Sequence, residues 1–214
     1  PFADSSQIPT YLVSHLTKQH VKVSLSGDAG DELFGGYGRY LWNNDPWSMS
    51  RKIPKLVRHL IADWLRLPSV DSWNAFGSGF ECFLSAKMRK RPIGDRAHDF
   101  AEVLAADHPD ECYRNHVSHW KRPTDVVLGS SEPLTALTDR SRWPDSIDFE
   151  HRLMALDSRS YLPDDILVKV DRAAMGVSLE TRMPFLDHRV LEFAWSLPLS
   201  MKIRNGQGKW ILRQ

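Results

Sequence analysis

The spacing of apolar residues along the chain predicts a mostly helical structure. Between residues 53 and 67, apolar side chains recur every three or four positions, which is typical of a helix with one buried face, and Pro68 ends the pattern. Residues 8–19 show the same spacing, with Pro9 near the helix start, where its missing N–H group leaves no hydrogen bond unmade. Further helices are predicted over 97–106, 110–120, 148–161, 165–178 and 187–196.

One segment has the pattern of a strand. VKVSL, at residues 21–25, is short and β-rich and runs directly into Ser-Gly, so that helix, strand and glycine turn follow in the order typical of α/β domains. Residues 69–95 predict short helices with loops, and residues 121–146 predict a long irregular connection. MKIRNGQG, residues 201–208, predicts a short extended piece and a turn. The chain is therefore expected to be mostly α-helical, with one clear strand near 21–25.

Composition and charge narrow the function classes. The chain has 214 residues, of which 42% are hydrophobic, and its net charge of +1 provides no field that would attract a nucleic acid or an anionic membrane. No apolar run is long enough to span a bilayer. Cys82 and Cys112 lie far apart, which favours reduced thiols and a cytoplasmic location. Since the sequence lacks an initiator Met and ends within a predicted helix, we expect a piece of a longer protein.

Carboxylates and glycines are concentrated in LSGDAGDELFGGYGRY, residues 25–40, here called the acidic glycine loop. Glycines let backbone N–H groups approach an anion, yet Asp28, Asp31 and Glu32 would repel a bare phosphate. Because Mg²⁺ between carboxylates and phosphates removes that conflict, the loop predicts a nucleotide-phosphate site with metal, or a general-base site beside one. An ordinary turn that opens a helix is equally compatible, with Asp28 or Asp31 as N-cap and Glu32 favoured by the helix dipole.

Two blocks of sequence resemble the synthetase domain of the glutamine-hydrolysing asparagine synthetases. The first is VSLSGDAGDELFGGYGRY, residues 23–40, and the second is YLPDDILVKVDRAAMGVSLETRMPFLDHRVLEFAWSLP, residues 161–198. The opening PFADSSQIPTYLVS and the ending KIRNGQGKWILRQ also resemble segments of that family. The resemblance thus includes both ends of the chain, whereas residues 69–146 are not diagnostic.

The resemblance implies a fold, a reaction and a set of partners. The parent fold is expected to be α/β, a parallel sheet with helices of the ATP-pyrophosphatase or adenine nucleotide α-hydrolase type, and residues 1–214 are expected to be part of a single synthetase domain. The reaction is ATP- and Mg²⁺-dependent: aspartate is activated as β-aspartyl-AMP with release of pyrophosphate, and ammonia from glutamine converts it to asparagine and AMP. An upstream pyrophosphate-binding loop and an N-terminal glutaminase domain in cis are expected outside this chain, which alone is expected to be inactive. A homodimer is one possible assembly.

Five residues take roles from the resemblance. Ser26 and Gly27 match positions that contact the nucleotide, and Asp31 matches the carboxylate that handles magnesium and pyrophosphate. Asp28 matches an acidic position proposed to take a proton as ammonia attacks, which is reasonable because the attacking nitrogen becomes cationic. Lys209 matches a lysine that lies against the phosphate and the developing oxyanion.

Ala29 departs from the family pattern, which leads us to expect Gly at this position. If the backbone there requires a positive φ angle, alanine costs about 1 kcal/mol. The departure therefore bears on the geometry of the acidic glycine loop and not on its chemistry.

Other polar residues are interpreted mainly as structural. Asp164 and Asp165 predict acidic capping of a helix that starts at Pro163, with a ligand role as the alternative. Glu180 and Arg182 predict a buried bracing pair, with a role in positioning substrate as the alternative. Lys169, in a predicted helix, lines a cleft or makes ion pairs within the helix. His116 and His119 have a spacing that can chelate a metal, and KMRKR at 87–91 is a basic run, but solvated helix surfaces are favoured for both.

Other functions stay open at this level. Within the same resemblance, relatives close β-lactams or amidate other carboxylates, so the acceptor need not be aspartate. The alternative from another class is a helical interaction module without catalysis. A nucleic-acid-binding role would require a steep salt dependence that the small net charge disfavours.

Overall fold

The computed structural model describes residues 4–41, 50, 52–77, 92–118, 120, 123–145 and 148–214. The chain divides into two compact units. The first unit combines Pro1–Leu41 with Leu128–Gln214, and the second consists of Trp42–Val127. The prediction that the whole chain is part of one synthetase domain stays a prediction.

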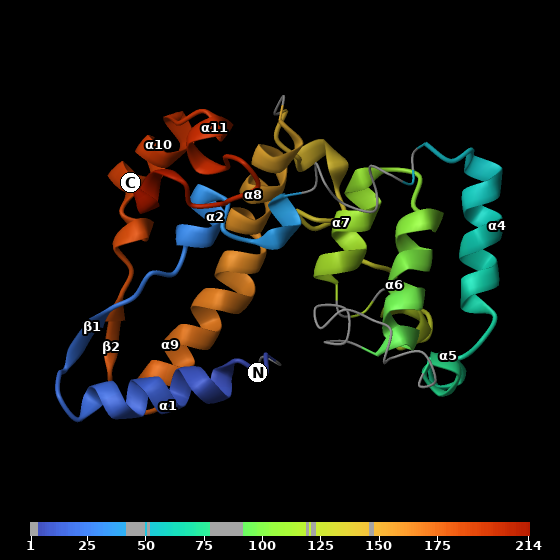
Figure 1. Ribbon diagram of the computed structural model, residues 1–214. Helices are drawn as coiled ribbons and strands as arrows, with labels where there is room; N and C mark the ends of the chain where they lie inside the picture. The colour runs from blue at the N-terminus through green and yellow to red at the C-terminus, as the bar shows by residue number, and fades with distance from the viewer. Residues whose placement is uncertain are drawn as a thin grey trace. The chain divides into compact units, whose positions relative to one another are not determined.

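The second unit is helical where it is described. Its elements are α4 (Lys55–Arg66), α5 (Val70–Gly77), α6 (Ile93–Ala105), α7 (Pro109–Val117) and a short 3₁₀ turn, Pro123–Asp125. Helix α6 packs against α4 and α5 (Figure 1), and Ala62, Ala101 and Leu104 form the buried contact between α4 and α6. The helix predicted over 53–67 is thereby confirmed as α4. His119 and the basic run lie outside the described residues.

The first unit contains the predicted site residues. Its amino-terminal part holds α1 (Gln7–Lys18), β1 (Val23–Leu25), α2 (Gly30–Phe34) and the 3₁₀ turn η1 (Gly38–Tyr40). Its carboxyl-terminal part consists of 3₁₀ turns at Arg140–Arg142, Pro184–Leu186 and Ile211–Arg213, and of α8 (Phe149–Arg159), the π-helical turn η7 (Leu162–Ile166), α9 (Leu167–Met175), β2 (Glu180–Arg182), α10 (His188–Ser196) and α11 (Leu199–Lys202).

A small parallel sheet joins the two parts of this unit. Strand β1 pairs with β2 in the register Val23↔Glu180, Ser24↔Thr181 and Leu25↔Arg182 (Figure 1). The strand predicted near 21–25 is confirmed, but the expectation of one strand was incomplete. Strand β2 has three residues, too few for an alternating pattern to be visible in the sequence. A parallel pair with helices in its crossover is the arrangement of α/β proteins.

The helix expected to start at Pro163 begins earlier. Backbone bonding continues past Ser160, because the Asp164 N–H donates to the Ser160 carbonyl at 2.9 Å, and Leu162–Ile166 widens into a π-helical turn before α9. Proline has no N–H group for the regular helical ladder, which gives a physical reason for the local widening. Asp164 and Asp165 lie in the first turn of this element with Pro163 at its start, as predicted, but no side-chain cap hydrogen bond forms there.

Two buried clusters fix the surroundings of the acidic glycine loop. Leu33 and Phe34 of α2 pack with Ala194 of α10, and Ala29 packs with Leu162 and Ile166 of the π-helical turn, each cluster being less than one-tenth exposed. The inner face of α2 is therefore anchored in the core of the first unit. None of the described helices is both long enough and apolar enough to cross a membrane.

Candidate active site

The acidic glycine loop leaves β1 and enters α2 through a left-handed residue. Ala29 has a φ angle of 72° and is 2% exposed. The backbone at this position therefore does require a positive φ angle, and alanine carries a conformational cost of about 1 kcal/mol there. Burial of its methyl group beside Leu162 and Ile166 offsets that cost by a similar amount, about 0.8 kcal/mol.

The N-terminus of α2 is not capped by a side chain. Ala29 occupies the N-cap position, so the interpretation in which Asp28 or Asp31 caps an ordinary helix is wrong. Asp31 and Glu32 lie in the first turn, where a negative charge interacts favourably with the helix dipole.

Asp31 and Lys209 meet although they lie at opposite ends of the chain. The Lys209 Nζ atom is 2.9 Å from Asp31 Oδ2, and each side chain is about one-third exposed. The Lys209 backbone N–H donates to the Phe34 carbonyl at 2.8 Å, so both the main chain and the side chain of Lys209 contact α2. The structure therefore brings together the predicted metal-handling carboxylate and the predicted charge-stabilising lysine.

Two glycines make this close approach possible. A Cβ atom at Gly36 would lie 1.8 Å from Asp31 Oδ1 and 2.5 Å from Lys209 Cε. A Cβ atom at Gly208 would lie 1.9 Å from the Gly35 carbonyl oxygen. Side chains at these positions would overlap the neighbouring atoms, so the backbone contact between the two segments requires glycine on both sides.

A tight turn presents Lys209. Arg204 and Gln207 exchange two backbone hydrogen bonds of 2.9 Å around Asn205 and Gly206, whose φ angles are 53° and 72°. Positive φ at both central residues is the signature of a type I′ turn, for which Asn-Gly is the preferred pair. The Trp210 N–H then donates to the Lys202 carbonyl at 2.9 Å. The turn predicted from MKIRNGQG is confirmed, whereas its first two residues, Met201 and Lys202, belong to α11 instead of an extended piece.

A cavity of about 500 Å³ lies at the carboxyl end of β1. Ser26, Asp28 and Lys169 line it together with hydroxyl-bearing and apolar residues of α1 and of the two strands. The Ser26 hydroxyl donates a hydrogen bond to the Asp28 carboxylate. Ligands of open α/β sheets bind beyond the carboxyl ends of the strands, and the volume is within the range of small-molecule sites.

Lys169 both lines this cavity and makes an ion pair. Its Nζ atom, on a side chain that is nearly buried, lies 2.9 Å from Asp4 Oδ2 and 2.8 Å from Ser6 Oγ. Burial alone would raise the pKa of Asp4, but hydrogen bonds from Lys169 and Ser6 outweigh it and lower the pKa to about 2. The ion pair therefore joins α9 to the start of α1, rather than residues within one helix.

Sequence reasoning missed a buried network of hydrogen bonds behind the acidic glycine loop, and it grouped Glu32 with the carboxylates expected to face a phosphate. Glu32 is 1% exposed and accepts a 2.9 Å hydrogen bond from the Tyr37 hydroxyl, and burial raises the pKa of its carboxyl group. Arg39 and Tyr40 both bind the buried carboxylate of Asp157 on α8. The sequence signal for this network is the GYGRY end of the loop, which places tyrosine rings close to an arginine.

Glu180 and Arg182 form a pair, but not a buried one. The Arg182 Nε atom lies 2.8 Å from Glu180 Oε1, and the side chains are 67% and 55% exposed. They flank Thr181 on β2, so the alternation of a strand places both on the same, open side. The prediction of a buried bracing pair was wrong.

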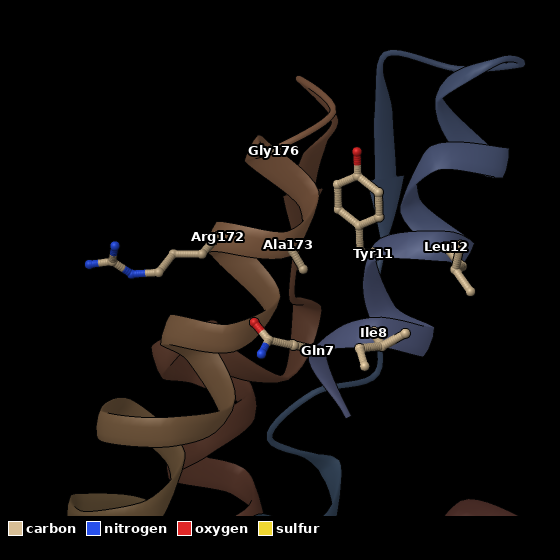
Figure 2. A pocket seen from close by; sticks show the side chains of 7 residues that line it. All are labelled: Gln7, Ile8, Tyr11, Leu12, Arg172, Ala173 and Gly176. Carbon is tan, nitrogen blue, oxygen red and sulfur yellow. The ribbon is translucent and has the colours of Figure 1, made fainter. Parts of the chain in front are cut away.

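A second hollow lies away from these residues. A groove of about 350 Å³ lies between α1 and α9. In Figure 2 the Tyr11 ring lies near Ala173 and Gly176, and Arg172 points away from α1. Apolar side chains dominate the groove, and none of the five predicted site residues lines it.

The donor set fits magnesium only when a substrate supplies further ligands. Among the described residues, no three His, Cys, Asp or Glu side chains group to hold a metal ion on their own. Asp31 offers one partly exposed carboxylate. One or two carboxylates plus phosphate oxygens are the usual protein ligands of Mg²⁺ with nucleotides, so Asp31 fits this mode of binding.

Comparison with known proteins shows which family the chain is similar to. Residues 1–214 match the family model for asparagine synthase. Glutamine-hydrolysing asparagine synthetase 1 of Bacillus subtilis (strain 168) is 31% identical over 221 residues, which cover all of this chain and 31% of the relative. Asparagine synthetase 3 of the same organism is 25% identical over 92% of this chain and 24% of its own, and that of Gallus gallus is 43% identical over 44% of this chain and 17% of its own.

The chain spans just under a third of the length of the first Bacillus relative. No solved structure matches it. The family model nevertheless extends over the complete sequence and includes every predicted site residue. The chain therefore belongs to the asparagine synthase family.

Proposed function

We propose that the protein containing this chain makes asparagine from aspartate, ATP and ammonia derived from glutamine. The observation that carries the proposal is the contact between Asp31 and Lys209, because a carboxylate and an ammonium group from distant segments meet beside a glycine-rich backbone. Family membership supports the reaction class, since the relatives are named as glutamine-hydrolysing asparagine synthetases.

In the first proposed step, the side-chain carboxylate of aspartate attacks the α-phosphorus of ATP and pyrophosphate leaves. Ser26 and Gly27 contact the nucleotide, and Ser26 is suitably placed on the wall of the cavity at the end of β1. Asp31 would hold Mg²⁺ together with phosphate oxygens, and the ion would supply positive charge beside the phosphate groups. Lys209 stabilises negative charge as it develops, because its ammonium group is fixed before the reaction begins.

In the second proposed step, ammonia attacks the acyl carbon of β-aspartyl-AMP, the bond to the phosphate oxygen breaks, and AMP leaves. The attacking nitrogen loses a proton, which Asp28 accepts. The position of Asp28 on the cavity wall and its hydrogen bond from Ser26 support this role.

The rest of the protein is expected to complete the machinery. A glutaminase domain in cis would supply ammonia, and an upstream phosphate-binding loop would complete the nucleotide site on a larger parallel sheet of the ATP-pyrophosphatase type. The parallel pairing of β1 with β2 supports such a sheet. We further propose a cytoplasmic location and, as one possible assembly, a homodimer.

ATP–pyrophosphate exchange in the intact protein, with a panel of carboxylic acids, tests the proposal. Aspartate should support exchange in the presence of Mg²⁺. Exchange with another acid but not with aspartate would make the substrate assignment wrong, and no exchange with any acid would overturn the reaction class. The 214-residue chain alone should show little or no turnover, so asparagine synthesis by this chain would contradict the need for an upstream loop.

A further inference from the structure

Helix α2 carries Asp31 but is too short to be stable by itself. It has five residues, Gly30–Phe34, and isolated helices need about 12–15 residues before they are even marginally stable in water. Its direction, and hence the position of the Asp31 carboxylate relative to Lys209, must come from contacts with the rest of the unit.

Glu32 connects the inner face of α2 to the chain that follows it. Its side chain is almost fully buried and accepts the 2.9 Å hydrogen bond from the Tyr37 hydroxyl. Tyr37 comes directly after the Gly35-Gly36 turn, so this bond closes the turn from inside. A movement of the Tyr37 ring would therefore also displace Glu32 and the helical turn that carries Asp31.

Arg39 holds the Tyr37 ring in place. The centre of its guanidinium group lies 4.2 Å from the centroid of the Tyr37 ring and 4.7 Å from that of Tyr161, and these two rings meet edge to face at 5.9 Å. Its Nε atom lies 2.8 Å from the Oδ2 atom of Asp157, which is fully buried on α8. The guanidinium group thus links the acidic glycine loop to α8 and to Tyr161, the residue directly before the π-helical turn.

We propose that Arg39 is a positioning residue that keeps Asp31 in contact with Lys209. The connection runs from Asp157 through the guanidinium group and the Tyr37 ring to Glu32 on α2. The contact itself is a structural property, and its importance for turnover rests on the proposed function.

Lysine cannot replace arginine in this arrangement. A guanidinium group is planar, so it stacks on aromatic rings while its edge binds a carboxylate, whereas an ammonium group is a compact charge that cannot do both. Arg39→Lys therefore keeps the charge near Asp157 but loses the stacking on Tyr37 and Tyr161. We expect the unit to stay folded, with greater freedom in α2.

The reactivity of single lysines tests the proposal without any requirement for activity. In the full-length protein, the acetylation rate of Lys209 is measured by mass spectrometry in wild type and in Arg39→Lys. We expect the Lys209 rate to rise about 3- to 10-fold, less than the 10- to 100-fold losses of affinity or activity that follow removal of a residue orienting a metal ligand. The rate at the nearly buried Lys169 should stay the same, because it rises only when the unit opens.

Two further variants keep the test decisive. Tyr37→Phe retains the ring but loses the hydroxyl that bonds Glu32, so it should raise the Lys209 rate even if Arg39→Lys fails to fold. Arg189→Lys changes an exposed arginine paired with Asp187 and should leave the rate unchanged. Unchanged Lys209 rates in folded Arg39→Lys and Tyr37→Phe, or parallel increases at Lys169, would overturn the proposal.

ATP–pyrophosphate exchange separates this inference from the proposed function. If the wild type supports exchange, Arg39→Lys should lower kcat and leave KM for the acceptor acid unchanged. Exchange in the wild type without any effect of the variant would overturn the importance of Arg39 for turnover alone. Lack of exchange in the wild type would overturn the proposed function, while the lysine-reactivity measurement would still decide whether Arg39 positions Asp31.

Discussion

At the scale of residues, Lys209 combines an important proposed role with a small share in stability. Lys209→Met removes the ammonium group beside Asp31, and we expect adenylate formation to slow by about 10²- to 10³-fold, as when one preorganised charge-stabilising donor is removed. The free energy of unfolding should change by less than about 1 kcal/mol, because the pair is partly exposed. Lys55→Met breaks an exposed pair with Asp107 in the other unit and serves as the control. A wild-type rate in Lys209→Met would remove the lysine from the mechanism.

Gly36 provides a second test of the same contact from the backbone side. The Cβ atom of Gly36→Ala would overlap Asp31 Oδ1, so the carboxylate has to turn away from Lys209. We expect a loss of activity of about 100-fold, the usual effect of misplacing a reacting group by about 1 Å.

Gly38→Ala is the matched control for Gly36→Ala. A Cβ atom there has nothing within 4 Å, and the residue lies in the same loop region. Its steady-state rate and its free energy of unfolding, measured by urea denaturation, should equal those of the wild type. Equal losses in both variants would mean that the loop is sensitive to any added methyl group, which contradicts a specific overlap with Asp31.

The sequence identified some residues of this site and not others for a physical reason. Asp31 and Lys209 stand in recognisable motifs, so their residue types and neighbours were sufficient to select them. Asp157 lies within α8 and Asp4 precedes α1, and only the folded chain brings them to Arg39 and Lys169. A buried carboxylate and an exposed one are the same letter in a sequence.

At the scale of elements, replacing the glycine of the turn before Lys209 should have a measurable conformational cost. Gly206 has a φ angle of 72° and open space where a Cβ atom would lie, so Gly206→Ala introduces backbone strain without a clash. We expect a loss of about 1 kcal/mol in the free energy of unfolding, measured by urea denaturation. Gly38→Ala, at an ordinary φ angle, should show no such loss. Equal stability of the two variants would mean that the turn rearranges freely.

Elements were predictable where their own side chains determined them. Helix α4 has a continuous apolar stripe, and the prediction of 53–67 came within two residues of its bounds at the start and one at the end. Strand β2 and the π-helical turn depend on partners far along the chain, namely β1 and the core around Ala29. Short elements with tertiary causes leave little periodic signal in a sequence.

At the scale of the whole molecule, the pairing of segments that lie far apart in the sequence could not be predicted from the sequence. The register Val23↔Glu180 joins segments separated by most of the chain, and the division into two units depends on which helices share a core. Periodicity indicated many helices and one strand, and the family resemblance implied an α/β parent, which agrees with a small parallel sheet among helices. Neither property specifies which segments meet.

Lys202 links the stability of the protein to pH. Its side chain is fully buried, Nζ has no hydrogen-bond partner within the described part of the chain, and the ammonium group lies 4.5 Å from the centre of the Trp195 ring. Burial lowers the pKa of Lys202 to about 8. The unfolded chain, with a lysine pKa near 10.5, therefore binds more protons than the folded one between about pH 8 and 10.5, and stability should rise with pH over that window.

Lys202→Met removes this dependence and should stabilise the protein below pH 8. Methionine keeps the apolar contact with Trp195, and the cost of burying a charge disappears, which we expect to be worth about 2–3 kcal/mol at pH 7. Urea denaturation at pH 7 and pH 10 measures the difference in the free energy of unfolding between variant and wild type, which should shrink at the higher pH because the buried amine of the folded wild type is then neutral. Burial and the Lys202 charge both lower the pKa of His151, so its pKa in an NMR titration should rise in the variant. A variant that is less stable than the wild type at pH 7, with an unchanged His151 pKa, would mean that the ammonium group is solvated in the folded protein.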